Sequence, residues 1–323
     1  MLTATRHSIT TRTDWLALRR DYLTASVVGC LFDLSPYKTL AAVWAEKTGV
    51  YVPPDGEDSQ LLERGRELED VVARLFSKRH PDWQVTKADE FLASDIRLGA
   101  SPDFYITDDK GRAGILQTKV VGSFQYRRNW LDGLPPQWII LQCLTESMLA
   151  DARFGIVGAL EIGDFKFDFH EHRIPRHPGA ERRIIEATVA FWMAVDSGQM
   201  PKPDYRRDKA LIGALYPREK AGKVLDWRSD NEMPVLLSRH EQLAAEIKAR
   251  EDELEIIEAR VKERMQDAER ALVDGFAITY KQIKRKAYTV KEAHYRQLRI
   301  NAKAEEGKSQ AAAEQGSKEK ETS

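Results

Sequence analysis

The sequence has few cysteines, no long apolar run and almost no net charge. Its two cysteines, Cys30 and Cys143, are too few for a disulfide framework or a zinc site, and both lie in apolar surroundings typical of core residues. No apolar stretch approaches the ~20 residues that cross a bilayer, and residues 1–13 lack the apolar segment of a signal peptide. A net charge of −1 excludes a globally basic protein, so nucleic acid could be contacted only by local patches. These absences predict a soluble protein of a reducing cytoplasm.

The residues that are present suffice for a large core with appendages. Hydrophobic residues make up 42% and aromatic residues 9% of the 323 residues, and this length is typical of about two domains or one core with additions. Mixed helix-like and strand-like patterns predict an α/β core over residues 1–230. Residues 231–301 predict an appendage made of an amphipathic helix and a short β segment. Residues 302–323 lack large apolar side chains, and this composition predicts a disordered tail.

The sequence pattern of residues 99–119 predicts two short strands joined by a polar turn. Asp103 begins the first strand, and Gln117 and Lys119 lie two residues apart on the second. Because successive side chains alternate across a strand, Gln117 and Lys119 project from one face, and pairing of the strands brings Asp103 beside them. Oxygen ligands next to a lysine are suited to Mg²⁺ and a scissile phosphate. The alternative interpretation is an ordinary hairpin with a solvated lysine.

Two groups of polar and basic residues are typical of phosphate contacts. Arg19 lies on a predicted helix, and the hydroxyls of Thr24 and Ser26 lie near the start of the next helix. Such groups are suited to a phosphate, but ordinary capping and a surface arginine explain them equally well. Arg127 and Arg128 lie among aromatic residues, a mixture suited to a DNA backbone. For these two the alternative is an exposed loop beside a buried tryptophan.

Glu69 and Gln142 are polar residues on predicted helices with apolar faces. Glu69 lies beside the apolar stripe of a helix over 61–78, and Gln142 lies among apolar residues of a helix over 137–151. A glutamate on a helix is usually solvated, so Glu69 alone indicates little. Whether Glu69 takes part in binding a metal ion depends on whether it lies close to the residues of the predicted hairpin.

The order and spacing of these motifs resemble the YqaJ-type viral recombinase family, whose members are relatives of phage lambda exonuclease among the PD-(D/E)XK nucleases. The resemblance extends over roughly residues 13–290. The motifs that carry it are Trp15 with Leu18-Arg19, Leu23-Thr24-Ala25-Ser26, Ser35-Pro36-Tyr37, Lys47-Thr48-Gly49, Leu68-Glu69, Ser101-Pro102-Asp103, residues 114–119, Gln142 and Asp274-Gly275-Phe276. The fold class it implies is an α/β core of the restriction-endonuclease-like kind, with a mixed central sheet flanked by helices.

The resemblance also implies roles for individual residues. Four positions match the family's metal site: Glu69, Asp103, Gln117 and, through its backbone carbonyl, Thr118. Two further positions match a catalytic lysine and a helical glutamine near the attacking water: Lys119 and Gln142. Three positions match the pocket for the 5′ phosphate of the substrate: Arg19, Thr24 and Ser26.

The function that the resemblance implies is resection of DNA ends. It implies an exonuclease that degrades linear double-stranded DNA from the 5′ end, with two Mg²⁺ or Mn²⁺ ions, for recombination by single-strand annealing. A single-strand annealing protein is the implied partner, and a homo-oligomer, a trimer in relatives of the lambda type, is the implied assembly. The implied location is the cytoplasm of a bacterial host, for a protein encoded by a phage or prophage.

Gln117 is the departure from the family pattern, which usually has glutamate at this position. An amide oxygen can bind Mg²⁺ but brings no charge. Gln117 is therefore a natural variant, a substitution made to trap substrate, or the sign of a weakened enzyme, and we favour the first. Two other functions stay open: a catalytically weakened or inactive protein that binds DNA ends or a recombination partner, and an endonuclease of the restriction type. The predicted 5′-phosphate pocket argues against the endonuclease, because such a pocket recognises ends.

Overall fold

The chain forms two compact units, Met1–Tyr216 and Pro217–Ser323. The division between the units comes after Tyr216, ahead of the boundary predicted at residue 230. Residues 217–229, which lie between these two points, are exposed. The functional division into core, appendage and tail stays a prediction. The computed structural model describes residues 2–51, 60–286, 292 and 295–300.

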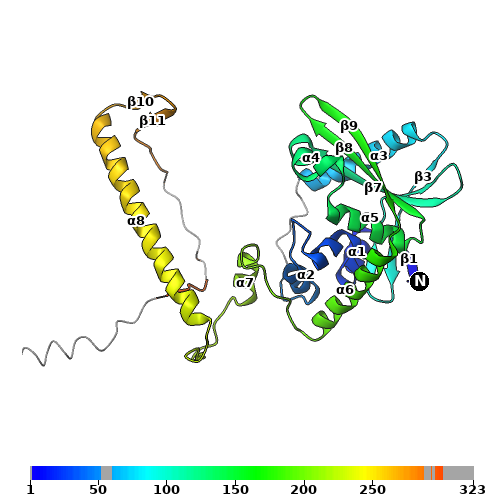
Figure 1. Cartoon of the computed structure of the whole chain (residues 1–323), viewed down its shortest axis with the longest axis horizontal. Coiled ribbons are helices and arrows are strands. Elements are labelled where there is room, and N and C mark those ends of the chain that lie inside the picture. Colours follow the sequence, from blue (N-terminus) through cyan, green and yellow to red (C-terminus); the bar gives the residue numbers. More distant parts are fainter. Residues whose placement is uncertain (1, 52–59, 287–291, 293–294, 301–323) are drawn as a thin grey trace, which may run out of the picture. The chain divides into compact units, whose positions relative to one another are not determined.

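The first unit contains most of the regular structure (Figure 1). Its helices are α1 (Arg12–Asp21), α2 (Leu40–Lys47), α3 (Gln60–Arg79), α4 (Ser123–Asn129), α5 (Gln137–Leu149), α6 (Pro178–Asp196) and α7 (Lys209–Leu215), with the 3₁₀ helices η1 (Ala25–Phe32) and η2 (Leu131–Gly133). Its strands are β1 (Ala4–Ser8), β2 (Leu23–Thr24), β3 (Gln84–Lys87), β4 (Glu90–Ser94), β5 (Leu98–Ala100), β6 (Phe104–Thr107), β7 (Ala113–Gly122), β8 (Phe154–Gly163) and β9 (Lys166–Pro175). The helices predicted around Glu69 and Gln142 are confirmed as α3 and α5. None of the described helices is long and apolar enough to cross a membrane.

A mixed five-stranded sheet lies at the centre of this unit, in the order β3-β6-β7-β8-β9. Strands β7 and β8 are parallel, and the other neighbours are antiparallel. The predicted fold class, a mixed central sheet flanked by helices, is therefore confirmed. A second sheet, in the order β1-β4-β5-β2, was not predicted as a separate sheet.

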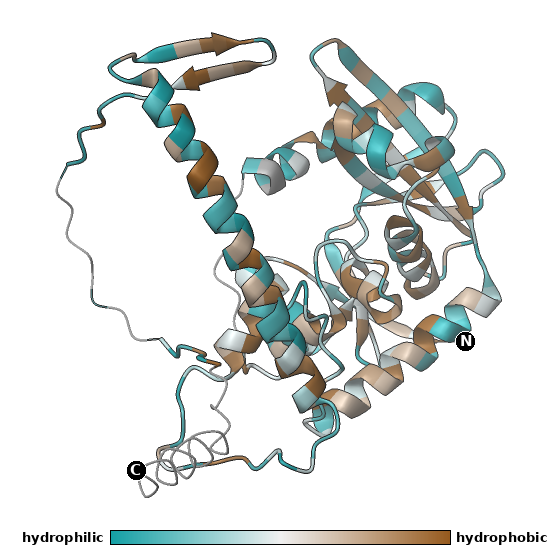
Figure 2. Cartoon of the chain, turned by 60° about the vertical axis from the view of Figure 1, so that its left-hand side comes forward, coloured by the Kyte–Doolittle hydropathy of each residue, from teal (hydrophilic) through white to brown (hydrophobic). Residues whose placement is uncertain are grey.

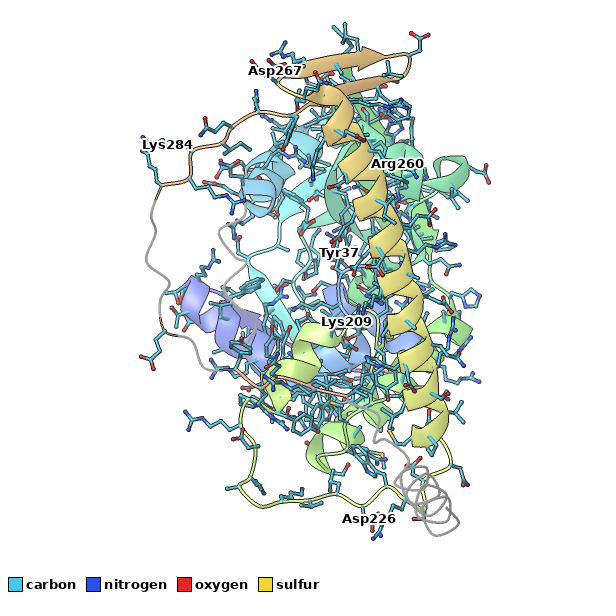
Figure 3. The ribbon with its side chains drawn as sticks, turned by 90° about the vertical axis from the view of Figure 1, so that its left-hand side faces the viewer. Tyr37, Lys209, Asp226, Arg260, Asp267 and Lys284 are labelled. Carbon is cyan, nitrogen blue, oxygen red and sulfur yellow. The ribbon has the colours of Figure 1, made fainter. Side chains whose placement is uncertain are left out.

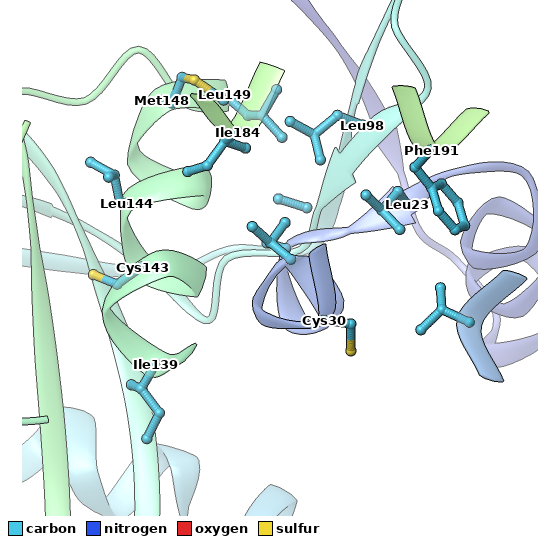
Figure 4. Packing of buried hydrophobic residues seen from close by; sticks show 14 of the residues in the cluster. Leu23, Cys30, Leu98, Ile139, Cys143, Leu144, Met148, Leu149, Ile184 and Phe191 are labelled. Carbon is cyan, nitrogen blue, oxygen red and sulfur yellow. The ribbon is translucent and has the colours of Figure 1, made fainter. Parts of the chain in front are cut away.

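Helices α3 and α5 cover opposite faces of the central sheet because successive residues of its strands alternate in direction. On β7, Ile115 packs in the cluster that includes α5, and Leu116 packs in the cluster that includes Phe76 of α3. Figure 4 shows the α5 cluster, with Cys143 on the helix and Cys30 on η1. Both cysteines are buried and free, so their predicted place in the core is confirmed.

The predicted hairpin of residues 99–119 is confirmed as β6 and β7. Phe104 pairs with Leu116, and continuation of that register brings Asp103 opposite Gln117. In the turn, Oδ1 of Asp108 accepts hydrogen bonds from the backbone N–H groups of residues 110 and 112, at 3.0 and 2.9 Å. This closed turn fixes the register, and the register determines which side chains meet at the end of the hairpin.

The second unit contains one long helix and a two-stranded hairpin: α8 (Met233–Met265), β10 (Arg270–Val273) and β11 (Phe276–Thr279). Brown and teal residues alternate along α8 in Figure 2, as expected for the predicted amphipathic helix. Figure 3 shows the side chains of α8, with Arg260 near its end and Asp267 just beyond it. The apolar stripe is largely exposed at Leu243, Ile247, Leu254 and Ile257. The predicted tail, residues 302–323, lies outside the described residues.

Candidate functional site

Most of the residues predicted to act together line one cleft of the first unit, with a volume of about 1060 Å³. Nine of the eleven predicted site residues contribute to its walls: Arg19, Thr24, Ser26, Glu69, Asp103, Gln117, Thr118, Lys119 and Gln142. They come from α1, β2, η1, α3, the β6–β7 hairpin and α5, so the fold gathers groups that are far apart in the sequence. The proposed role of each residue stays a prediction.

Asp103 is held at the end of the hairpin by three hydrogen bonds to one carboxylate oxygen. Its Oδ2 accepts from the backbone N–H of Thr118, the hydroxyl of Thr118 and the side-chain amide of Gln117, each at 2.7 Å. Hydrogen bonds to a charged group are the strong ones, so this carboxylate is fixed in orientation. Asp103 is only partly buried and also lines the cleft.

The Gln117 side chain connects Asp103 to helix α5. Its Nε2 donates to Asp103, and its Oε1 accepts from Nε2 of Gln142 at 3.1 Å. The reverse orientation of the amide would bring its oxygen against the carboxylate, so electrostatics favour the observed one. The amide oxygen, which was predicted to hold a metal ion, therefore points at Gln142. A metal-binding role for Gln117 requires the side chain to turn.

Glu69 brings a second carboxyl group to the cleft from α3. Burial, and then the nearby negative charge of Asp103, raise the pKa of Glu69 to about 7, while Lys87 and Lys119 act in the opposite direction. A carboxyl whose pKa responds to Asp103 shares its electrostatic environment. The predicted proximity of these two acids to Lys119 is consistent with this coupling, and all three line the cleft.

Glu146 is an acidic residue of the cleft that was not predicted from the sequence. Its side chain is 1% exposed, and its Oε1 accepts a hydrogen bond from Gln142 at 2.9 Å. Burial, followed by the charge of Asp103, raises the pKa of Glu146 to about 8. The available signal was the spacing, because a residue four positions after Gln142 lies on the same face of a helix.

The three residues predicted to hold a phosphate come from α1, β2 and η1 and line this same cleft: Arg19, Thr24 and Ser26. The guanidinium of Arg19 stacks over the ring of Trp15 at 4.3 Å, and the hydroxyls of Thr24 and Ser26 are 3.0 Å apart. The indole N–H of Trp15 donates to the hydroxyl of Ser101 at 3.2 Å, which ties α1 to the segment before the hairpin. Thr24 is the N-cap of η1 but makes no capping hydrogen bond with its side chain, and Ser26 lies inside η1, so ordinary capping does not explain these two hydroxyls.

Lys47 on α2 fixes the backbone that presents Arg19. Its ammonium donates to the carbonyl of Arg19 and, at 2.7 Å, to the carbonyl of Tyr22. These carbonyls lie at the end of α1, where a helix leaves acceptors unpaired. Burial, and then the charge of Arg19, lower the pKa of Lys47 to about 8. The position of Arg19 thus depends on a partly buried cation from another helix.

The cleft is more basic than the chain as a whole. Five cationic side chains line it, against three carboxylates: Arg12, Arg19, Arg64, Arg66 and Lys119 against Glu69, Asp103 and Glu146. The whole chain carries a net charge of −1. A polyanion is attracted to such a local excess of positive charge even when the net charge of the protein is near zero.

Arg127 and Arg128 lie apart from this set. They are exposed residues of α4 and are not among the residues that line the cleft. The expected loop is a short helix, anchored by the stacking of Tyr126 on Trp130 with ring centroids 5.1 Å apart. Trp130 is buried, as the alternative interpretation of this segment expected. A role of the two arginines in DNA binding stays a prediction.

The donor set of the cleft fits a hard divalent cation. Carboxylates of Glu69 and Asp103 and the carbonyl of Thr118 are oxygen ligands of the kind that Mg²⁺ prefers. Among the described residues, no group of three or more histidine, cysteine, aspartate or glutamate side chains is close enough to hold a metal ion. Gln117 is an amide and therefore does not count toward such a group.

Comparison with known proteins finds a family model that matches part of the chain and one relative that matches most of it. Residues 14–153 match the YqaJ-like viral recombinase domain, so the resemblance predicted from the motifs is confirmed. The chain is 23% identical over 301 residues to the protein named Uncharacterized protein YqaJ of Bacillus subtilis (strain 168), with 86% of each chain covered.

Two solved structures are similar to part of the chain. An alkaline exonuclease (LHK-Exo) from Laribacter hongkongensis has a TM-score of 0.47 and 19% identity, with 62% of this chain and 98% of that chain covered. A phage-related exonuclease from Haemophilus somnus 129PT has a TM-score of 0.40 and 13% identity, with 55% and 96% covered.

Proposed function

We propose, from the match of residues 14–153 to the YqaJ-like viral recombinase domain, that the protein is a metal-dependent exonuclease acting on linear double-stranded DNA. One observation carries the proposal. Asp103, Lys119 and the hydroxyls and arginine of the predicted phosphate pocket line the same basic cleft. A site for phosphodiester hydrolysis next to a site for a terminal phosphate is suited to an enzyme that begins at DNA ends.

The proposed chemistry divides roles among the residues of the cleft. Glu69, Asp103 and the Thr118 carbonyl would hold the cations, two Mg²⁺ or Mn²⁺ ions, and Gln117 would add a further oxygen once its side chain has turned. When bound, the metal supplies charge stabilisation of the phosphate and a more acidic water. Lys119 lies next to the scissile phosphate and offsets its negative charge. Gln142 donates a hydrogen bond to Gln117 and lies where it would meet the attacking water.

Polarity follows in this proposal from the phosphate pocket. Arg19, Thr24 and Ser26 hold the 5′ phosphate, so that the strand is degraded from its 5′ end and a 3′ single strand is left. A single-strand annealing protein then binds the product during recombination in the bacterial cytoplasm. We further propose a homo-oligomer, with the exposed apolar stripe of α8 available for assembly or for the annealing partner.

A second candidate function is favoured by Gln117. Its amide donates to Asp103, so a neutral side chain occupies the acceptor that a cation would otherwise use. On this alternative the protein binds DNA ends or a recombination partner on the same fold and cleaves slowly or not at all. The presence of Glu69, Asp103, Lys119 and Gln142 around the same cleft favours the active enzyme.

The two candidates separate in one experiment. The purified protein is incubated with linear duplex DNA and with covalently closed circular duplex, in Mg²⁺ and in EDTA. The exonuclease degrades only the linear DNA and only in Mg²⁺. Retarded but intact linear DNA in Mg²⁺ supports the binding protein, and cleavage of the closed circle supports an endonuclease.

A further inference from the structure

Glu146 is a buried carboxyl group whose hydrogen bonding is incomplete. It is 1% exposed, and within the described part of the chain its Oε2 has no hydrogen-bond partner. Buried polar groups are nearly always paired, because an unpaired one loses the free energy of its hydration. Glu146 nevertheless lines the cleft that holds Asp103 and Lys119. An acid kept in this state next to the site requires an explanation.

A chain of three hydrogen bonds connects Glu146 to Asp103. Gln142 uses Nε2 to donate both to Glu146 Oε1, at 2.9 Å, and to Gln117 Oε1, at 3.1 Å. The Nε2 of Gln117 donates to Asp103 Oδ2 at 2.7 Å. Two acids therefore end a chain whose interior consists of two neutral amides. A change of charge at Glu146 acts on Gln117 through Gln142.

We propose that Glu146 supplies to the cation site, from helix α5, the negative charge that Gln117 does not supply from strand β7. This inference rests on the proposed metal-dependent function. Burial and the charge of Asp103 raise the pKa of Glu146 to about 8. A cation bound between Glu69 and Asp103 shifts Glu146 back toward its ionised form, because a nearby positive charge lowers the pKa of a carboxyl group. Glu146 acts from outside the set of metal ligands, through its charge and through Gln142, which donates to its carboxyl group.

The proposal predicts that positions 117 and 146 substitute for each other. Mn²⁺ binding is measured by electron paramagnetic resonance on the full chain without DNA, for wild type, Glu146→Gln, Gln117→Glu and the double variant. Glu146→Gln lowers Mn²⁺ affinity by about tenfold, which is the usual cost of losing a group that supports metal ligands. Gln117→Glu restores the affinity in the Glu146→Gln protein but changes it by less than about threefold in wild type.

The matched control is Glu161→Gln, which replaces a second buried glutamate outside the cleft. Glu161 is 4% exposed and pairs with His170 at 3.1 Å. This variant retains the wild-type affinity for Mn²⁺ if the effect at position 146 is specific. Equal losses in both variants overturn the proposal, because a general effect of removing buried acids then accounts for them.

Two further outcomes decide the remaining cases. If Gln117→Glu changes affinity by the same factor with and without Glu146, the two positions are independent and Glu146 has no compensating role, while the proposed nuclease function is unaffected. If wild type binds no Mn²⁺, the metal-dependent function is wrong, and the role of Glu146 with it.

Discussion

Replacement of Arg19 by alanine tests whether the N-terminal side of the cleft recognises a terminal phosphate. The substitution removes the guanidinium that stacks on Trp15 at 4.3 Å. It keeps the backbone carbonyl that accepts from Lys47. The lost stacking contributes about 0.5–1 kcal/mol at a partly exposed site, so we expect the fold to survive and the effect to appear in substrate preference.

The magnitude follows from the hydrogen bonds that an arginine makes to phosphate. A hydrogen bond to a charged group contributes about 1.5–3 kcal/mol, and ~1.4 kcal/mol is a factor of ten in rate. If one such hydrogen bond is lost, Arg19→Ala therefore degrades DNA with a 5′ phosphate about 10- to 100-fold more slowly than wild type does. A 5′ hydroxyl end has no phosphate for Arg19 to hold, so the rate at which this end is degraded should be nearly the same in wild type and Arg19→Ala.

The assay compares initial digestion rates of 5′-phosphorylated and 5′-hydroxyl linear duplex for wild type, Arg19→Ala and Arg20→Ala. Arg20 is the matched control, because it is the next residue on α1, is exposed and does not line the cleft. We expect wild type and Arg20→Ala to prefer the phosphorylated end and Arg19→Ala to lose most of that preference. Equal wild-type rates on both ends, or an undiminished preference in Arg19→Ala, would refute the role of Arg19.

Two further predictions concern stability and the second unit. Because burial and Arg19 lower the pKa of Lys47 from 10.5 to about 8, the unfolded chain binds more protons than the folded chain between these values, and the free energy of unfolding rises with pH in that window. We expect this rise in unfolding free energy to be about 1–2 kcal/mol smaller in Lys47→Met than in wild type. Urea unfolding at pH 8 and pH 10 measures it, and an equal rise in the two proteins would contradict the prediction. A chain ending at Tyr216 should fold and retain Mg²⁺-dependent activity, since both large apolar clusters lie before that residue; a folded but inactive truncation would show that the second unit contributes to the chemistry.

The parts of the fold that could be predicted are those where burial imposes a period. Helices α3 and α5 and the β6–β7 hairpin have one or two faces in the core, so their apolar residues recur at helical or strand spacing. Strand β1 was not predicted, because four of its five residues are exposed and nothing forces an alternating pattern. Short segments such as α4 likewise lack enough turns to show a period.

The residues of the candidate site that could be predicted lie in motifs whose spacing is informative. Those that were missed contribute to the cleft only through the packing of the folded chain. Asp103 and Gln117 are near in sequence, and the hairpin register brings them together. Glu146 lies on a helix in which eight residues are buried, and its distance from the cleft depends on how α5 packs on the sheet. Lys47 acts on the backbone of another helix, and a contact of this kind leaves no pattern in the sequence.

The central claim is that hydrolysis takes place in the cleft at Asp103, and the single-turnover rate of Asp103→Asn on linear duplex DNA in Mg²⁺ tests it most directly. Asparagine keeps the size of the side chain, and its oxygen can still accept from Thr118. The matched control is Asp109→Asn, an exposed aspartate in the turn of the same hairpin. We predict a loss of at least about 1,000-fold for Asp103→Asn, which corresponds to ~4 kcal/mol of activation free energy, and an unchanged rate for Asp109→Asn. A folded Asp103→Asn protein within tenfold of the wild-type rate would contradict the account.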